Sequence, residues 1–226
     1  MNLNRALIPR ETPSGRKPGK AAATRMEIIV TLARMIEERK GISECNIREI
    51  GERVGIQPSS IYYHFKSKDE LLDELLNLSV NLITISVMDA IAAQGPDATV
   101  RERLIAALHA HLSMALGDND DDAAAIMRIY AYLPPAMKDR SRQARVKYRS
   151  IWKGLLEEAC RKGELRADLD LDILLSYLLA GLGTVGSWYR PDRMTIDGVC
   201  KVLIDLHTQG GLIPLPEQKV ANAEPE

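Results

Sequence analysis

Apolar residues recur along most of this chain at the spacing of α-helices. The first apolar stripe ends near Gly41 and consists of Ile28, Ile29, Leu32, Ala33 and Ile36. The same pattern predicts further helices over residues 46–54, 67–93, 99–116, 123–131, 135–161, 170–189 and 195–207. Because we find neither convincing strand alternation nor an internal repeat, we expect an all-α fold.

Two local motifs mark where helices of the first third begin. Asn46 stands three residues before Glu49, and Ser67 stands three residues before Glu70. In a capping box of this kind, the first side chain accepts a hydrogen bond from the third helical amide, and the glutamate reaches back to the capping residue. Gly55 ends the shorter helix, and the Gln-Gly-Pro sequence at residues 94–96 breaks the longer one.

The segment between the two caps, residues 46–68, has the length and the turn of a helix-turn-helix. Its short helices are separated by residues 55–57, and the second begins near Pro58, a residue tolerated in a first helical turn. At the angular spacing of a helix, Ile61 and Phe65 face the interior. The rest of the surface carries hydroxyl and imidazole groups, from Ser59, Ser60, Tyr62, Tyr63 and His64. Short hydroxyls approach base edges closely and the other groups donate to phosphates, so the pattern is typical of a helix that faces a DNA groove.

Charge is distributed in a way that agrees with this hypothesis. The chain of 226 residues holds 30 Lys and Arg against 31 Asp and Glu, for a net charge of −1. Residues 1–70 hold 13 of the basic residues but only 9 of the acidic ones. The near-neutral total excludes a DNA coat protein that is basic throughout, and the basic first third indicates that one part of the chain meets a polyanion.

The two ends of the chain differ in composition from the helical part. Residues 1–23 predict a flexible basic arm, with a solvated tail that has no partner as the alternative; its cations are Arg5, Arg10, Arg16, Lys17 and Lys20. Residues 213–226 predict a second flexible tail. The start of the chain lacks a signal peptide, and the longest apolar stretch, residues 173–189, is shorter than the ~20 residues that span a bilayer. Together with three widely spaced cysteines, this predicts a cytoplasmic protein with no membrane partner.

The helix-turn-helix segment resembles the tetracycline-repressor (TetR) family of bacterial regulators. The resemblance rests on Ile47-Arg48-Glu49-Ile50 and on residues 55–72, and it is strongest from Tyr62 to Leu72. It implies a DNA-binding head over residues 24–70 and a helical ligand-binding and dimerisation body over residues 71–212. It also implies that DNA is contacted by Asn46, Arg48, Gln57, Ser59, Ser60, Tyr62, Tyr63, His64 and Lys68. In the family, the last two long helices pair in a dimer interface, although core packing alone also explains the apolar character of residues 170–189.

The helix expected over residues 135–161 admits two interpretations. Its basic residues indicate either a solvated face, which we favour, or an arginine at the mouth of an apolar pocket that holds an anionic head group. The candidate ligand-binding residues are Tyr130, Arg145, Tyr148, Trp152 and Trp188. A shorter resemblance, over residues 165–170 and 188–191, is to family members that sense acyl-CoA thioesters, and it implies an acyl-CoA or fatty acid as the effector.

Enzyme and cofactor hypotheses find little support in the sequence. Residues 181–186 spell the G-x-G-x-x-G pattern, but no strand precedes them and Pro191 leaves no room for the helix that a dinucleotide site needs. His109 and His111 point in different directions on a helix, and Cys160 and Cys200 lie in apolar contexts. We therefore predict no catalytic residues, no metal and no cofactor.

The resulting hypothesis is a ligand-released repressor that binds a palindromic operator as a homodimer. Two other classes stay open on the sequence alone. One is an all-α binding protein or enzyme whose head does not bind DNA, and the other is an architectural DNA-binding protein that has no ligand.

Overall fold

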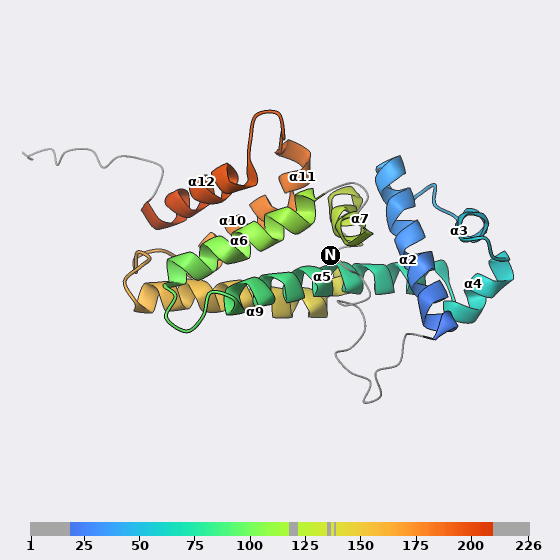
Figure 1. Ribbon diagram of the computed structural model, residues 1–226, viewed down its shortest axis with the longest axis horizontal. Coiled ribbons are helices and arrows are strands. Elements are labelled where there is room, and N and C mark those ends of the chain that lie inside the picture. Colours follow the sequence, from blue (N-terminus) through green and yellow to red (C-terminus); the bar gives the residue numbers. More distant parts are fainter. Residues whose placement is uncertain (1–18, 118–121, 135–136, 138, 210–226) are drawn as a thin grey trace, which may run out of the picture.

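The computed structural model describes residues 19–117, 122–134, 137 and 139–209, and every regular element in these ranges is a helix (Figure 1). The prediction of an all-α fold is confirmed. The first elements are α2 (Lys20–Arg39), α3 (Ile47–Val54), α4 (Pro58–His64), α5 (Lys68–Ala92), α6 (Val100–Leu116) and α7 (Asp122–Arg128). The later ones are the 3-10 helices η1 (Ile129–Tyr132) and η2 (Asp139–Ser141), then α9 (Arg142–Arg161), α10 (Leu171–Gly183), α11 (Val185–Trp188) and α12 (Ile196–Gln209).

Helices α2, α3 and α4 form a head at one end of the molecule (Figure 1). Helix α3 packs against both α2 and α4, and the predicted apolar stripe of α2 is fully buried. The side chains of Ile50, Ile61 and Phe65 close this small core from the other two helices, each with at most 1% of its surface exposed. The pattern of apolar residues therefore predicted the buried face of the head correctly.

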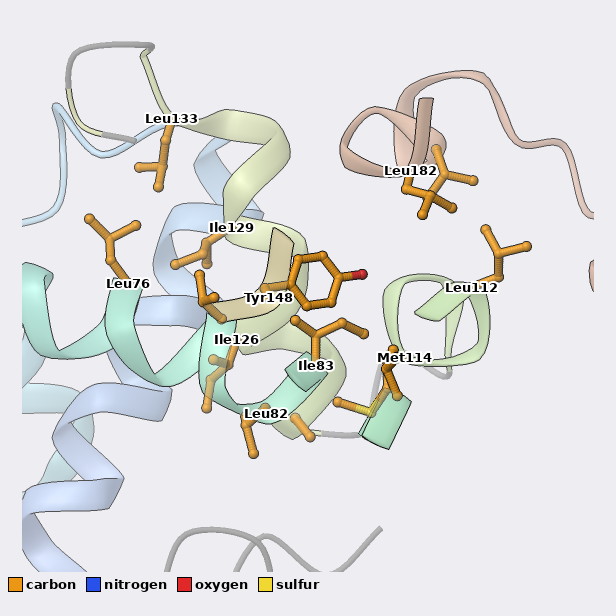
Figure 2. Packing of buried hydrophobic residues seen from close by; sticks show 14 of the residues in the cluster. Leu76, Leu82, Ile83, Leu112, Met114, Ile126, Ile129, Leu133, Tyr148 and Leu182 are labelled. Atoms are coloured by element: carbon orange, nitrogen blue, oxygen red, sulfur yellow. The ribbon is translucent and has the colours of Figure 1, made fainter. Parts of the chain in front are cut away.

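Helix α5 leaves the head and continues into the body, where α6, α7 and α9 pack against it. Helix α12 lies on α6, and α10 lies on α9. Figure 2 shows side chains from α5, α6, α7, η1, α9 and α10 meeting in one aliphatic core, with the Tyr148 phenol as its polar member. By length and composition alone α5 is apolar enough to cross a membrane, but in this fold its apolar side chains pack against the surrounding helices. The boundary predicted at residue 70 falls within the first turn of α5, so this helix belongs to both parts.

Several predicted boundaries were wrong. The helix expected over residues 170–189 stops at Gly183 and restarts at Val185, because three glycines weaken it and the Thr184 hydroxyl donates to the Ala180 carbonyl at 3.0 Å. The helix expected from residue 135 begins at Arg142. The helix expected to end at residue 131 is α-helical to Arg128 and continues as η1. Residues 20–23 of the expected arm are helical, whereas residues 1–18 and 210–226 lie outside the described ranges.

The two predicted capping boxes form only in part. The Asn46 side chain accepts from the Glu49 amide at 2.9 Å, and the Ser67 hydroxyl accepts from the Glu70 amide at 3.1 Å. Glu49, however, pairs with arginines of the head instead of reaching back, and Glu70 accepts from the Lys66 amide at 2.7 Å. A complete capping box, which was not predicted, forms between Thr99 and Glu102 at the start of α6.

Candidate DNA-binding surface and effector cavity

The turn between α3 and α4 depends on two glycines. Gly55 ends α3 in the left-handed region, with φ of 76°, a conformation that glycine adopts without steric cost. A Cβ atom on Gly51 would lie 2.9 Å from the Ile56 carbonyl oxygen, which is closer than packed atoms allow. The Ile56 amide donates to the Gly51 carbonyl at 2.9 Å at the same place. The close crossing of the two helices therefore follows from residues 51 and 55 having no side chain.

Helix α4 divides into a buried and an exposed face, as its sequence predicts. Tyr63 is 83% exposed and Tyr62 is 54% exposed, and Ser59 and Ser60 are also exposed. Phe65, at the end of α4, is buried in the core of the head. The Arg25 guanidinium covers its ring, 4.0 Å from the centroid. A surface of exposed hydroxyl groups on a firmly packed helix suits contact with a DNA groove.

Arg25 fixes the end of α4 to α5. Its guanidinium donates to the backbone carbonyl of His64 and forms an ion pair with Glu74 on α5, with Nε donating to Oε1 at 2.9 Å. This residue was not among those singled out in the sequence. The sequence gives no signal for this role, because the partners of Arg25, namely His64 and Glu74, are brought to it only by the fold.

The other predicted DNA-contact residues surround α4. Asn46, Arg48 and Gln57 are exposed, and Arg48 makes only an exposed pair with Glu52 at 3.2 Å. His64 and Lys68 are half-buried, and the Lys68 ammonium donates to the Ile42 carbonyl at 3.4 Å. The predicted residues therefore lie on one continuous segment, which runs from the N-cap of α3 through α4 to the first residue of α5.

An ion-pair network lies behind α3. Glu49 accepts from Arg39 of α2 and from Arg53 one turn along α3, and Arg53 also pairs with Glu38 at 2.7 Å. The hydrogen bond from Arg39 holds the pKa of the Glu49 carboxyl below its usual range. Glu38 and Glu49 are therefore engaged with arginines of the head, and these pairs join α2 to α3.

The body contains a cavity of about 590 Å³ between α5, α6, α7, η1, α9, α10 and α11. Its inner wall is aliphatic and buried, with Val80, Ile83, Leu182 and Val185 among the lining residues. Its exposed edge, which we call the mouth, is formed by α9 on one side and by the end of α10 and α11 on the other. Three arginines of α9 line the mouth, namely Arg142, Arg145 and Arg149.

One polar pair crosses the inner wall. The Tyr148 hydroxyl lies 2.6 Å from His111 Nδ1, and His111 Nε2 lies 3.3 Å from the Leu182 carbonyl oxygen. Because a carbonyl only accepts, Nε2 carries the proton of the neutral ring, and Nδ1 accepts from the tyrosine. Burial lowers the pKa of His111 to about 4 and raises that of Tyr148, so both groups are neutral at physiological pH. The pair joins α6, α9 and α10 around the cavity.

The predicted ligand-binding residues are not all at this cavity. Arg145 and Tyr148 line it, but Trp152 is fully buried beside a separate void of about 20 Å³ between α6, α9, α10 and α12. Trp152 follows Tyr148 by one turn, and its ring fills the core there. Trp188 lies on the outer side of α11, 37% exposed, and does not line the cavity. The side chain of Tyr130 lies outside the described part of the chain.

Several cavity-lining residues were not predicted from the sequence. His111 appeared only as half of a rejected metal pair, although its place on the apolar stripe of α6 is the signal that it is buried. The arginines of α9 are spaced by three and four residues, which puts them on one face, but a solvated face was the favoured interpretation. Arg128 and Tyr132 carried no signal, because their place at the cavity depends on how α7 and η1 pack against α2 and α6.

Fold and site together define a helix-turn-helix DNA-binding protein whose body contains a separate ligand cavity. The chain belongs to the TetR family. Residues 29–75 match the family model described as bacterial regulatory proteins of the tetR family, and residues 97–210 match the tetracyclin repressor-like C-terminal domain. It is accordingly a non-catalytic, DNA-binding transcriptional repressor of the kind found in the bacterial cytoplasm.

Individual relatives are distant but cover most of the chain. The transcriptional repressor KstR2 of Rhodococcus jostii is 24% identical over 204 residues, which is 88% of this chain and 95% of that protein. The regulator FadR of Bacillus subtilis, solved with stearoyl-CoA, superposes with a TM-score of 0.68 at 21% identity, over 83% of this chain and 99% of that one. AibR, solved with isovaleryl coenzyme A and operator DNA, gives a TM-score of 0.66 at 20% identity, over 82% and 98%.

Proposed function

We propose that this repressor binds a palindromic operator as a homodimer and is released from it by an acyl-CoA. The observation that carries the choice of effector is the cavity, which combines a buried aliphatic wall with three arginines at its mouth. An acyl-CoA has the matching halves, an apolar chain and a head group with several phosphates. A neutral apolar molecule would have no use for the arginines.

The mouth has the electrostatics that a phosphate group requires. Arginine binds phosphate oxygens through two parallel N–H donors. Arg145 pairs with Asp139 at 3.1 Å and Arg149 reaches Asp172 at 3.6 Å, with both aspartates largely exposed. Exposed pairs of this kind contribute little, so a phosphate can replace the carboxylates at small cost. No carboxylate within the described ranges pairs with Arg142.

The similar structures support the same class of effector. FadR was solved with stearoyl-CoA, and AibR was solved with isovaleryl coenzyme A together with operator DNA. The two acyl groups differ greatly in length, so the fold itself does not set the chain length. The acyl chain length that this protein prefers is to be measured in the release experiment below.

A homodimer is supported by an apolar surface that the single chain leaves exposed. Ile173 and Tyr177 on α10 are each 69% exposed, and Val202 and Leu206 on α12 are 58% and 43% exposed. Exposed apolar residues on neighbouring helices are the usual mark of a protein–protein interface. In our proposal, this surface pairs with its copy in a partner subunit.

The dimer would then present two copies of α4 to the DNA. Recognition helices of dimeric helix-turn-helix proteins enter successive major grooves about 34–36 Å apart. We assign base and sugar–phosphate contacts to Gln57, Ser59, Ser60 and Tyr62, and phosphate contacts to Tyr63, His64 and Lys68, with Arg48 reaching a groove or a phosphate and Asn46 close to the backbone. Release follows if the acyl-CoA prefers a dimer in which this spacing does not fit the operator.

The deciding experiment separates the two halves of the effector. The purified protein selects its operator from random DNA fragments, and a mobility shift then follows release by octanoyl-CoA, stearoyl-CoA, free coenzyme A and the free fatty acids. We expect at least one acyl-CoA to release the operator at a concentration tenfold lower than coenzyme A or the matching fatty acid. Equal action by the fatty acid, or no release by any thioester, would overturn the assignment of the effector.

A further inference from the structure

Two residues of the cavity wall are bonded directly to the head. Arg128 at the end of α7 and Tyr132 at the end of η1 both line the cavity, and the side chain of each also contacts α2. The other cavity-lining residues come from α5, α6, α9, α10 and α11 as well as α7. Because α2 is the helix on which α3 is packed, these two contacts join the effector cavity to the DNA-binding surface through side chains.

Arg128 bonds both to α2 and to the end of α6. Its guanidinium forms a two-point ion pair with the Glu37 carboxylate of α2, with Nη2 donating to Oε2 at 3.2 Å, and its Nη1 donates to the Gly117 carbonyl at the end of α6 at 2.9 Å. The side chains of Arg128 and Glu37 are 13% and 20% exposed. Displacing one partner of a pair this well covered is costly, because the other charge is then left covered and unpaired.

Tyr132 makes the second contact. The Lys40 ammonium donates to its hydroxyl at 3.0 Å and lies 4.7 Å from the centroid of its ring. Lys40 ends α2 in the left-handed region, with φ of 54°. Its backbone position is therefore fixed by the end of the helix, so a shift of Tyr132 acts on a defined point of the head.

We propose that Arg128 and Tyr132 are the residues through which an occupant of the cavity acts on the head. Their bonding partners there are Glu37 of α2 and Lys40 at its end. The inference rests on the proposed function only in that an effector enters this cavity. An acyl-CoA supplies what is needed at both residues, since its phosphates or thioester carbonyl compete for the guanidinium and its chain presses on the phenol ring. Either interaction weakens one of the bonds that set the position of α2.

A second ion pair between α2 and α7 provides a matched comparison. Arg34 lies one turn before Glu37 and donates to Asp122 of α7 at 2.7 Å and 3.0 Å. Asp122 does not line the cavity. The pair therefore joins α2 to α7 as the Glu37 pair does, but it has no contact with an occupant.

The experiment compares two variants by the factor through which effector binding weakens operator binding. In the wild type, this ratio of operator Kd values at saturating octanoyl-CoA or stearoyl-CoA, whichever binds more tightly, is expected to lie within the usual range of about 5–150. In the Glu37→Gln/Lys40→Met double variant we expect a ratio below 3, with the effector still binding in the absence of DNA. Arg34→Gln is expected to keep the wild-type ratio. An unchanged ratio in the double variant, or an equal fall in Arg34→Gln, would overturn the proposal.

A second arm needs no effector. Ala115 lines the cavity on the last turn of α6, so Ala115→Phe places a bulky group inside it, and Ala115→Leu is a milder version if the first variant unfolds. We expect the larger side chain to weaken operator binding about tenfold in the wild-type background and less than twofold with Glu37→Gln/Lys40→Met. An equal change in both backgrounds contradicts the proposal. If no acyl-CoA binds the wild type, the proposed effector fails while this arm still decides the role of Arg128 and Tyr132.

Discussion

The DNA-binding surface and the effector cavity are built in opposite ways. The candidate DNA contacts come from one continuous segment, residues 46–68, in which two caps, two glycines and a short apolar repeat determine the geometry locally. The cavity is lined by residues scattered from Ser79 to Ser187 on seven elements. A local site keeps its shape as long as its own turn is correct. A dispersed site depends on every contact between the helices that surround it.

The two regions also differ in how the hydrogen bonds of their polar groups are satisfied. Tyr62 and Tyr63 on α4 project outward, where water or DNA satisfies their hydroxyls. In the cavity, by contrast, His111 and Tyr148 satisfy each other inside the protein. The first arrangement is available to a new partner at once, whereas the second contributes to the packing of the body.

The largest expected effect breaks the head and leaves the body intact. Phe65→Ala removes the ring that supports α4 and that Arg25 covers, and deletion of a buried Phe costs about 3–5 kcal/mol. We expect operator binding to be lost in mobility shifts, and hydrogen exchange to rise in α3 and α4 but not in α6 or α9. Phe65→Leu is the milder control. Equal loss of protection in α6 and α9 would show that the head and the body do not unfold separately.

The next effect concerns the body and depends on pH. The pKa of His111 is about 4 in the folded protein and about 6.5 in an unfolded chain, so the unfolded state binds more protons between these values. Stability is therefore lost as the pH falls from about 6.5 to 4, by roughly 3 kcal/mol in all. Urea unfolding at pH 7.5, 6 and 5 measures the part of this loss that falls above pH 5, about 2 kcal/mol. His111→Gln should remove most of it, and His109→Gln, on the same helix, should retain it. A pH dependence that survives His111→Gln would assign it to another group.

A third effect separates the arginines of the mouth from the aliphatic wall. We expect Arg142→Gln/Arg149→Gln to weaken acyl-CoA binding at least tenfold, about 1.4 kcal/mol, because phosphate contacts are lost. The affinity for the free fatty acid should stay within twofold, since the apolar wall is unchanged. Calorimetric titration measures both, with Lys147→Gln, an exposed α9 residue that does not line the cavity, as the matched control. A parallel loss for the fatty acid would mean that the arginines support the cavity rather than the phosphates.

The smallest effect distinguishes positioning from base recognition within the head. Lys68→Ala should weaken binding to all duplexes by a similar factor and reduce the slope of log Kd against log salt by about one, as expected for one lost phosphate contact. Ser59→Ala should leave the slope unchanged and alter the preference among operators. Fluorescence anisotropy over a range of salt concentrations measures both. The assignment of Lys68 to a phosphate fails if its slope equals that of the wild type.

The sequence predicts the head far better than the body for the reason that this comparison gives. Ile61 and Phe65 were assigned to the core, and Ser59 and Tyr63 to the surface, because helical periodicity decides these positions without knowledge of the rest of the fold. Even there, the partners of long polar side chains were missed: Glu49 binds Arg39 of another helix instead of closing its own capping box.

In the body, helical periodicity predicted the helices but not the contacts between them. Tyr148 and Trp152 are one turn apart on α9, so periodicity assigns both to the same face. Tyr148 nevertheless lines the large cavity, whereas Trp152 fills the core. The break between α10 and α11 at Thr184 separates Leu182 from Val185, both of which line the cavity, and the Thr184 hydroxyl bonds to the Ala180 carbonyl at this point. Such choices depend on the competition between several neighbouring helices, which periodicity along one helix does not record.

Helix α5 connects the head to the body as one continuous helix. It is a single rod of 25 residues, so it is about 37 Å long, and its first turn supports α4 while its far end lies among the body helices. Tilting a rod of that length by about 5° moves its tip about 3 Å, close to the 3.4 Å rise of one base-pair step. In the symmetric dimer that we propose, the two displacements would add. A rearrangement of a few degrees deep in the body would then be enough to put both heads out of register with consecutive turns of the double helix.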